Sequence, residues 1–289
     1  MTRHAIVAAL LLVLFPRLAP AADDSKLFDR ANLVAWCIVP FDAKKRNPEE
    51  RAAMLESLEI KRYAYDWRAE HLPTFDDELN AIQRHGIELT AVWFPGSLDN
   101  DAKHLLATLA KHGLKTQLWV TGGGEPTKSP EEQQVRVNAE AARIKPIAEA
   151  AAKQGCTVAL YNHGGWFGEP ENQIQIIKNL ESQGVSNVGI VYNLHHGHDH
   201  LDRFPILLQT MRPYLVALNL NGMEKNGDTQ GKKIMIIGQG NEDARLLTLI
   251  RDSGWHGPIG ILNHTDEDAE ARLRANRDGL EQLVKSIGD

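Results

Sequence analysis

The sequence predicts an α/β protein that folds as one (β/α)8 barrel. After residue 22, a short β-rich run followed by a longer segment of helical spacing repeats eight times in about 255 residues. Glycine follows five of the helical segments, at the position where a helix commonly ends in the left-handed backbone conformation. A doubly wound open sheet is the alternative, and it is disfavoured because no Gly-rich phosphate turn follows the first strand. Since no linker or shift in composition divides the 289 residues, one domain over 23–289 is expected.

The elements can be assigned in chain order. β-Branched and aromatic residues mark the strands, which are 33–39, 61–65, 87–94, 115–120, 156–162, 188–193, 215–221 and 259–262. Helical spacing marks the segments 48–58, 74–84, 101–111, 130–153, 171–183, 204–211, 242–253 and 266–286. Pro48 suits a first helical turn, and Thr74 can cap the second helix. The C-cap glycines are Gly86, Gly113, Gly155, Gly184 and Gly254.

Residues 1–22 form a segment that we expect to be removed. A short basic start precedes the apolar run 5–15, and Ala19-Pro20-Ala21 supplies small residues for signal peptidase. This is the order of a secretory signal peptide, with cleavage expected after Ala21 or Ala22. The run is too short to cross a bilayer, and no later segment is long and apolar enough. The mature protein is therefore expected to be exported, most simply to a bacterial periplasm, without membrane association.

Composition narrows the class of partner. Apolar residues make up 43% of the chain and charged residues 24%, which is typical of a globular protein with a substantial core. The net charge of −6 gives no reason to expect nucleic acid or an anionic membrane as a partner. The two cysteines, Cys37 and Cys156, both lie in apolar runs, and we expect buried free thiols rather than a disulfide.

Histidines collect where three predicted strands end. Four of the twelve lie in 192–200, directly after the strand 188–193, and others follow the strands 156–162 and 259–262. In a (β/α)8 barrel these strand ends meet around the active site. Imidazole serves as metal ligand and as general acid or base, so the run predicts chemistry. A solvated His-rich loop is the alternative for the run taken alone.

Tryptophans and asparagines follow the same strand ends. Trp67, Trp93 and Trp166 can stack on a sugar ring, while amides and imidazoles can bind hydroxyl groups. A cavity lined in this way suits a small polyol better than an apolar ligand. The amides expected to bind hydroxyl groups are Asn193, Asn219, Asn221 and Asn263.

The segments 61–94 and 159–223 resemble the xylose isomerase-like TIM barrels, the sugar phosphate isomerase/epimerase group, and the likeness covers the whole mature chain. The resemblance implies an enediolate-type isomerisation or epimerisation, in which a divalent metal and acid–base groups move a proton next to a carbonyl. Members hold the metal with a Glu, then an Asp with a nearby His, then a His, then a Glu at successive strand ends.

This chain departs from that pattern residue by residue. The family's Glu-Asn-His is matched by Tyr161-Asn162-His163, and its Asp-x-x-His by Asn193 and His196. The later His and Glu positions hold Asn219 and Asn263. Neutral amides in place of two carboxylates and a His would bind a hard divalent cation weakly. The family's metal site, as usually built, is therefore expected to be absent.

Two interpretations of the histidines stay open. In one, a displaced site for zinc or another transition metal uses imidazoles, with Asn193 or Asn221 helping. In the other, no metal is bound and the side chains hold a sugar. The candidate ligands of the displaced site are His163, His196, His198 and His264.

We therefore expect an exported isomerase or epimerase that acts on an unphosphorylated sugar or keto-sugar by proton abstraction next to a carbonyl. His163 and His196 are the expected acid–base pair, and Tyr161 joins them if the pKa of its phenol is lowered. Glu125 and Asp66 are further carboxylate candidates, each with a capping or ion-pair role as the alternative. Other functions left open are a lyase that performs β-elimination on a 3-keto-glycoside and a catalytically silent carbohydrate-binding barrel. Hydrolytic metal chemistry, as in the endonuclease relatives of the fold, is disfavoured by the acidic net charge.

Overall fold

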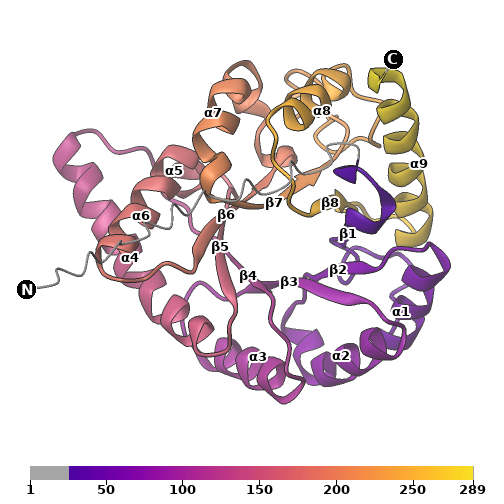
Figure 1. Cartoon of the computed structure of the whole chain (residues 1–289), viewed down its shortest axis with the longest axis horizontal. Helices are drawn as coiled ribbons and strands as arrows, with labels where there is room; N and C mark the ends of the chain where they lie inside the picture. Colours follow the sequence, from indigo (N-terminus) through magenta and orange to yellow (C-terminus); the bar gives the residue numbers. More distant parts are fainter. Residues whose placement is uncertain (1–25, 289) are drawn as a thin grey trace, which may run out of the picture.

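The computed structural model describes residues 26–288, in which eight parallel strands close into a barrel in chain order (Figure 1). Pairing of the first strand with the last closes the ring, with Leu33 opposite Ile259. The strands are β1 (Leu33–Trp36), β2 (Arg62–Tyr65), β3 (Glu88–Phe94), β4 (Gln117–Val120), β5 (Thr157–Tyr161), β6 (Val188–Asn193), β7 (Leu215–Leu220) and β8 (Ile259–Leu262). The predicted single-domain (β/α)8 barrel is confirmed. The predicted signal peptide lies outside the described residues.

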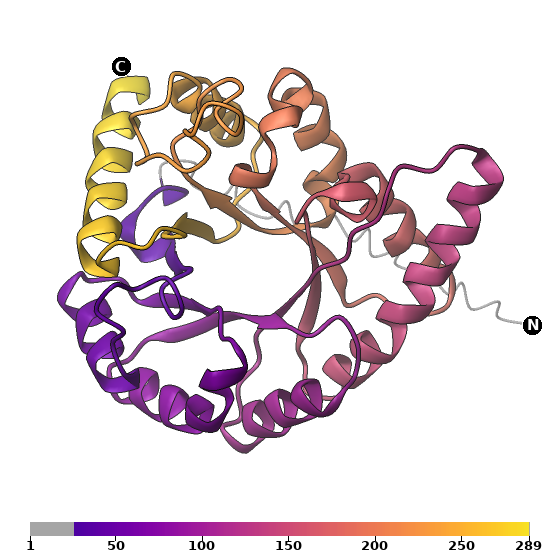
Figure 2. The same ribbon diagram turned by 180° about the vertical axis from the view of Figure 1, so that it is seen from behind.

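Helices surround the barrel, as Figure 2 shows from behind. They are α1 (Pro48–Ser57), α2 (Phe75–Arg84), α3 (Asn100–Lys111), α4 (Pro130–Ala152), α5 (Gly165–Gly168), α6 (Pro170–Ser182), α7 (Phe204–Met211), α8 (Asp243–Asp252) and α9 (Ala269–Gly288). The short α5 was not expected from the sequence. No helix within residues 26–288 is long and apolar enough to span a membrane.

The sequence places most helix ends correctly, for identifiable reasons. All five predicted C-cap glycines have positive φ, between 63° and 82°. Pro48 starts α1 as expected, and Asn47 caps it in a reciprocal pair with Glu50. Thr74 does stand at the N-cap position of α2, but the prediction of a side-chain cap is wrong. Its hydroxyl instead donates to the His71 carbonyl at 3.0 Å, because a 3₁₀ helix precedes α2.

The first strand is shorter than predicted, and its end shapes the barrel mouth. It was expected to reach Val39 but stops at Trp36, because Cys37 adopts φ 60° and cannot continue a strand. The Val39 N–H leaves the sheet and donates to the Asp66 carboxylate at 3.1 Å. Both cysteines are buried and free, as expected.

Two apolar clusters hold the fold together. The larger lies between the barrel and its helices, where residues such as Leu55, Ile144 and Leu246 are fully buried. The smaller fills the barrel interior with small residues and then, toward the carboxyl ends of the strands, with bulky aromatic rings. Its members are Val34, Trp36, Cys37, Ala64, Ala91, Trp119, Ala159, Tyr161, Val191, Ala217 and Leu262. The aromatic layer gives the barrel mouth a closed floor.

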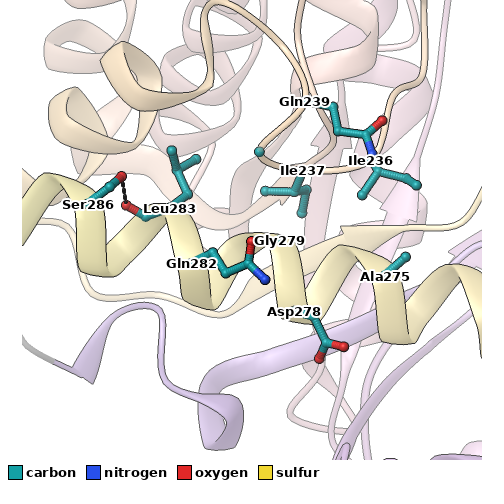
Figure 3. A pocket seen from close by; sticks show the side chains of 10 residues that line it. Ile236, Ile237, Gln239, Ala275, Asp278, Gly279, Gln282, Leu283 and Ser286 are labelled. Carbon is teal, nitrogen blue, oxygen red and sulfur yellow. Dashed lines mark hydrogen bonds between the residues drawn. The ribbon is translucent and has the colours of Figure 1, made fainter.

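The segment 221–242, between β7 and α8, is an ordered excursion rather than a free loop. Gly222 pairs with Met235 in an antiparallel bridge. The carboxylate of Asp243 accepts the N–H groups of Met223, Gly238 and Gly240 at 2.6 to 3.1 Å. Ile237 lies against α9 (Figure 3), and its N–H donates to Asn276 Oδ1 at 3.1 Å. A Cβ at Gly279 would stand 1.9 Å from the Ile237 carbonyl oxygen, so only glycine allows this approach.

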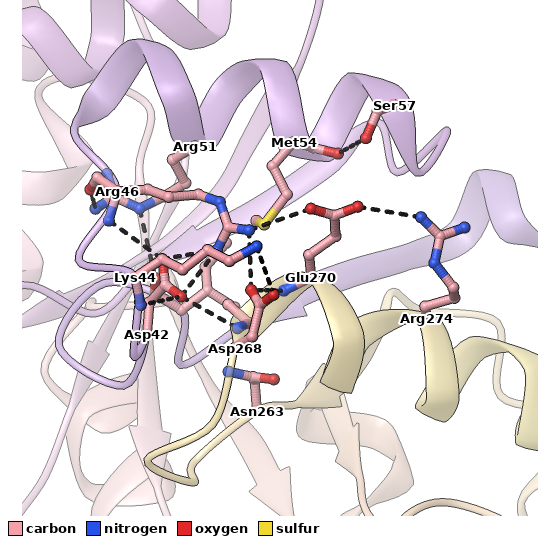
Figure 4. Close-up of polar contacts among 12 residues, drawn as sticks. Asp42, Lys44, Arg46, Arg51, Met54, Ser57, Asn263, Asp268, Glu270 and Arg274 are labelled. Atoms are coloured by element: carbon pink, nitrogen blue, oxygen red, sulfur yellow. Dashed lines mark hydrogen bonds and ion pairs between the residues drawn. The ribbon is translucent and has the colours of Figure 1, made fainter.

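An ion-pair cluster secures the place where the barrel closes, beside α1 and α9 (Figure 4). Asp42, in the loop after β1, accepts the Ala269 N–H at 3.1 Å and pairs with Arg46 at 2.9 Å. Arg46 also contacts Asp268 at 2.8 Å, and Lys44 contacts the same carboxylate at 2.8 Å. Although burial opposes it, these hydrogen bonds hold the pKa of Asp42 below its usual value. The cluster fixes the loop 37–47 over the barrel mouth.

Candidate active site

A cavity opens at the carboxyl ends of the strands, where a barrel of this kind carries its active site. Its enclosed volume is about 50 Å³, well below that of most small-molecule sites, and about 320 Å³ when the space open to solvent is included. It is lined by side chains from the ends of β1, β2, β3, β5, β6 and β8. These are Trp36, Cys37, Phe41, Asp66, Arg68, Trp93, Tyr161, His163, His195, His196 and His264.

Aromatic rings form the floor. The Trp36 and Trp119 rings meet edge to face with centroids 4.6 Å apart, and Trp93 meets Tyr161 in the same way at 5.2 Å. The Tyr161 hydroxyl accepts hydrogen bonds from Trp36 Nε1 at 3.3 Å and from the amide of Asn193. Burial raises the pKa of Tyr161, which is the opposite of what an acid–base role requires. Tyr161 lies at the cavity as predicted, but it acts as a fixed, neutral part of the floor.

Four histidines form one wall. The ring centroids of His163 and His196 are 4.4 Å apart, those of His195 and His196 3.6 Å, and those of His195 and His264 5.5 Å. Burial, together with His163 and Lys233, lowers the pKa of His196 to about 3. Burial also lowers the pKa of the other three. All four imidazoles are therefore neutral near pH 7, and each can donate one hydrogen bond and accept another.

His195 was not singled out from the sequence, yet it is the most enclosed of the four. Its side chain is 3% exposed, and its Nδ1 has no hydrogen-bond partner among the described residues. The Asn193 side chain accepts a hydrogen bond from the backbone N–H of His195 at 3.2 Å. This bond fixes the turn that directs the His195 side chain to the cavity. The His-rich run itself contained the signal for this residue, but nothing in the sequence distinguished it from His198.

The cavity also has two charged residues in its lining, Asp66 and Arg68. Asp66 is 1% exposed, and burial raises its pKa to about 6. Arg68 donates to the backbone carbonyls of Asp66 and Trp67 at 2.8 Å and lies over the Phe41 ring. The ring centroids of Phe41 and His264 are 3.9 Å apart, so the loop after β1 forms part of the cavity rim. No sequence signal identified Phe41, because its place depends on the loop conformation.

Six of the predicted site residues line this cavity, and eight do not. Those at the cavity are Asp66, Trp93, Tyr161, His163, His196 and His264. The other eight are not among its lining residues. They are Trp67, Trp166, Glu125, His198, Asn193, Asn219, Asn221 and Asn263.

The predicted sugar-stacking role of two tryptophans does not fit their positions. Trp67 is buried and donates to the Trp93 carbonyl at 2.6 Å. Trp166 is buried under α4, where its indole donates to Gln133 at 2.7 Å. Glu125, expected as a possible base, is exposed in the loop after β4 and is not among the cavity-lining residues.

His198 also departs from its expected role as a ligand. Its two ring nitrogens lie 3.3 Å and 3.0 Å from the carbonyl oxygens of Glu224 and Lys233. The ring thus secures the excursion after β7 and is not available to the cavity. Asn221 supports the same segment by donating to Gly222 and Lys233.

The remaining asparagines lie at the strand ends but hold the scaffold. Asn193 donates to Tyr161, and Asn263 donates to the Phe41 carbonyl at 3.1 Å. Asn219 is fully buried, and neither atom of its amide has a partner among the described residues. A Cβ added at Gly260 would stand 1.9 Å from Asn219 Oδ1. The Asn219 side chain therefore fills the space that any side chain at position 260 would need.

The residues at the family's metal positions do not fit a divalent cation. Tyr161 stays protonated, Asn193 presents its amide nitrogen to Tyr161, and Asn263 is tied to the loop after β1. These groups supply no anionic oxygen. Nor do three or more His, Cys, Asp or Glu side chains within residues 26–288 stand where they could hold a metal ion together. Neither the family's ligand set nor the expected His-based set is therefore assembled in this arrangement.

Comparison with solved structures shows the same fold. The IOLI protein with a bound zinc atom has a TM-score of 0.68 at 14% identity, over 89% of this chain and 99% of that one. The apo 3-keto-D-glucoside 4-epimerase YcjR from E. coli has a TM-score of 0.65 at 16% identity, over 88% and 99%. A D-psicose 3-epimerase crystallised in the presence of D-fructose has a TM-score of 0.60 at 13% identity, over 89% and 100%.

No curated protein matches the sequence. The family model for the xylose isomerase-like TIM barrel matches residues 55–284, which is most of the chain. With the closed barrel and the strand-end cavity, this match settles the membership that the motifs had suggested: the chain belongs to the xylose isomerase-like TIM barrel family.

Proposed function

We propose that this protein is an exported enzyme that isomerises or epimerises an unphosphorylated sugar or keto-sugar by moving a proton next to a carbonyl group. Membership of the family supports this reaction class, and solved structures of the same fold include epimerases of keto-sugars. Export is supported by the signal-peptide pattern of residues 1–22.

The observation that carries the proposal is the set of unpartnered polar atoms in the cavity. Asp66 Oδ2 and His195 Nδ1 are buried, line the same cavity and have no hydrogen-bond partner among the described residues. Buried polar atoms in native proteins are nearly always bonded to protein, water or ligand. A hydroxylated molecule supplies both donors and acceptors for them, and Trp93 in the aromatic floor offers an apolar ring for the sugar's C–H face.

The neutral imidazoles suit the carbonyl end of the substrate. An imidazole with a pKa of about 3, as at His196, is a weak base, but its N–H can bind a carbonyl oxygen that gains negative charge. His163 lies beside it and is more exposed, so it can exchange protons with solvent-facing hydroxyl groups. No step of the proposed reaction passes through a metal, because the side chains at the family's metal positions do not fit one.

Two other functions share this cavity. A lyase acting on a 3-keto-glycoside would use the same first proton abstraction, and the fold of a 3-keto-glucoside epimerase favours testing that substrate. A catalytically silent sugar-binding barrel is favoured by the replacement of the family's ligands by Tyr161 and three asparagines.

Product analysis on a panel of substrates tests the proposal. The mature protein would be incubated with D-fructose, D-psicose, common aldoses and methyl 3-keto-glucoside, and the products separated and identified by NMR. We expect an isomer or epimer of one of them, with turnover abolished in His163→Ala/His196→Ala while the circular dichroism spectrum is preserved. An unsaturated product would indicate the lyase, and sugar binding by calorimetry without any turnover would indicate the silent barrel.

Export is tested separately on the native chain. Mass spectrometry of protein from the periplasmic fraction should give an N-terminus after Ala21 or Ala22. An intact N-terminus in the cytoplasmic fraction would contradict this part of the proposal.

A further inference from the structure

The chain directs one buried carboxylate at the reaction cavity, and the sequence alone could not distinguish it from a structural group. Asp66 follows β2 directly and lines the cavity with Cys37 and Trp36 from the end of β1. It is the only carboxylate among the described cavity-lining residues. Every other carboxylate candidate from the sequence lies elsewhere.

The two oxygens of Asp66 have different surroundings. Oδ1 accepts the Val39 N–H at 3.1 Å, which fixes the orientation of the carboxyl group. Oδ2 is buried and accepts no hydrogen bond from an N–H or O–H group among the described residues. A purely structural aspartate normally uses both oxygens, because leaving one unpaired costs about 1–3 kcal/mol. Asp243 is such a case: it is 2% exposed, and its two oxygens together accept three backbone N–H groups.

The groups around Asp66 set its protonation. Burial raises its pKa to about 6, while the Val39 N–H, Arg68 and Arg51 oppose that rise. The carboxyl is therefore mainly ionised at pH 7 yet readily protonated, which suits a group that takes and returns a proton. The titratable or charged groups that interact with it are Cys37, Arg51, Tyr63, Tyr65, Arg68, Glu78 and Tyr161.

The neighbouring Cys37 does not compete as a base or nucleophile. Burial, the Asp66 charge and a weak hydrogen bond with the Asp66 carboxyl group raise the pKa of its thiol, so it stays protonated. Its φ of 60° is a strained conformation for a residue with a side chain, and it turns the chain so that Val39 can bind Asp66. Cys37 thus acts as a positioning residue for the carboxylate.

The other cavity groups are less suited to abstract a proton. The four histidines are weak bases because their pKa values are lowered, and the pKa of Tyr161 is raised, so the phenol keeps its proton. The guanidinium of Arg68 donates hydrogen bonds and has no acceptor atom. Among the described residues at the cavity, only Asp66 offers an anionic oxygen that is both unpaired and fixed in place.

We propose that Asp66 is the catalytic base of this site, a role that rests on the proposed function. Its carboxylate takes the proton from the carbon next to the sugar carbonyl, and an O–H bond forms on Asp66 as the C–H bond breaks. The freed electron pair forms the C=C bond of an enediolate, while the carbonyl pair moves to oxygen, where a histidine N–H binds it. After exchange with solvent, Asp66 returns a proton to the former carbonyl carbon, while the hydroxyl proton on the neighbouring carbon moves to the charged oxygen. This gives the isomer and regenerates the carboxylate without an oxidant or reductant.

Deuterium incorporation into methyl 3-keto-glucoside tests this role. In D₂O the wild-type protein should exchange the hydrogen next to the carbonyl, with kcat/KM falling below pH about 6 as Asp66 becomes protonated. Asp66→Asn, which keeps the acceptor for Val39, should lower the exchange rate by about 10²–10⁴-fold. Calorimetry should show the affinity for the sugar within a few-fold of wild type, and Asp66→Glu should recover part of the rate.

Asp243→Asn is the matched control, because Asp243 is equally buried and burial also raises its pKa to about 6, but it lies outside the cavity. This variant should lose stability and still show the fall in kcat/KM below pH about 6. If Asp66→Asn kept the wild-type rate and the fall at low pH, the role of Asp66 would be overturned while the proposed function stood. If wild type itself exchanged no deuterium into any sugar of the panel, the proposed function would fail instead.

A second measurement keeps the inference testable if Asp66→Asn does not fold. His196→Gln should reduce the exchange rate but retain the fall below pH about 6, because the titrating group is Asp66. Loss of that fall in His196→Gln would assign the titration to the histidine wall and contradict the role of Asp66.

Discussion

At the residue scale, the chemistry of the site depends on which oxygen or nitrogen is left without a partner. The four histidines at 195–200 look equivalent in the sequence, yet two face the cavity and two hold loops. His200 binds Tyr192 at 2.8 Å, and His198 binds the excursion after β7. Residue type identified the strand end correctly, but hydrogen-bond partners decide which side chain is available to a substrate.

Tyr161→Phe tests the conclusion that the phenol is part of the floor and not an acid. The change leaves Trp36 Nε1 and the Asn193 amide without their acceptor, so the free energy of unfolding should fall by about 1–3 kcal/mol. The pH dependence of turnover should not change. Urea denaturation and a pH–rate profile measure the two effects.

Tyr192→Phe provides the control for that variant. Its hydroxyl bonds His200 outside the cavity, so it should show a comparable loss of stability with unchanged kinetics. A pH–rate profile altered only in Tyr161→Phe would restore the phenol as a catalytic acid or base.

At the element scale, close contacts between loops and helices hold the mouth in shape. The strands and most helices follow from periodicity and from glycine C-caps, which are local signals. The end of β1 and the excursion 221–242 do not, because they depend on Cys37 leaving the sheet and on Asp243 collecting backbone N–H groups from distant residues. Such contacts have no local sequence pattern.

Gly279→Ala tests the packing of the excursion on α9. The added Cβ would stand 1.9 Å from the Ile237 carbonyl, so the loop or the helix must shift at a cost of about 1–3 kcal/mol. The higher helix propensity of alanine offsets up to ~1 kcal/mol of that cost. Gly288→Ala in the same helix meets nothing within 4 Å and should not lower the melting temperature. Equal melting temperatures for the two variants would show that the contact does not constrain the loop.

Asp42→Asn tests the ion-pair cluster where the barrel closes. Removing one member of this buried pair leaves the charge of Arg46 without its main partner. We therefore expect the free energy of unfolding to fall by ~3 kcal/mol at pH 7. The pKa of Asp42 is lower in the folded state than in the unfolded state. The carboxylate therefore contributes fully to the free energy of unfolding above the unfolded-state pKa of about 3.9. That contribution disappears as the pH falls through the lower folded-state pKa. Urea denaturation should therefore show the gap between wild type and variant narrowing below pH about 4.

The control for this change is Asp202→Asn, which removes an exposed partner of Lys225 and should change stability little. A gap between wild type and Asp42→Asn that stayed constant down to low pH would show that the carboxylate charge is not what stabilises the closure.

At the scale of the whole molecule, the sequence predicted the barrel, its single domain and the strand ends at which the cavity lies. It could do so because eight repeated units and the strand-end rule are global regularities. It predicted less of the cavity itself. Asn193 and Asn263 stand at the strand ends as expected, yet their amides are used by Tyr161 and by the loop after β1, a result that only the folded arrangement determines. Phe41 and His195 reach the cavity through backbone turns that side-chain identity does not encode.

Metal removal tests whether the barrel works without the family's ligand set. We expect no stoichiometric transition metal in protein purified without chelators, and no loss of activity after dialysis against EDTA, because neutral side chains occupy the metal positions. Elemental analysis and turnover before and after dialysis give the answer. One equivalent of zinc, with activity lost on its removal and restored on its return, would show that the histidines rearrange into a metal site.

The proposed function depends on proton transfer next to a sugar carbonyl in this cavity. Its most direct test is NMR of the keto-sugar recovered from D₂O after incubation with the wild-type mature protein, beside a sample without protein. We expect deuterium at the carbon next to the carbonyl at a rate well above the blank, and no such incorporation with the His163→Ala/His196→Ala protein. Keto-sugars recovered with no deuterium beyond the blank, from protein shown to bind them, would contradict it.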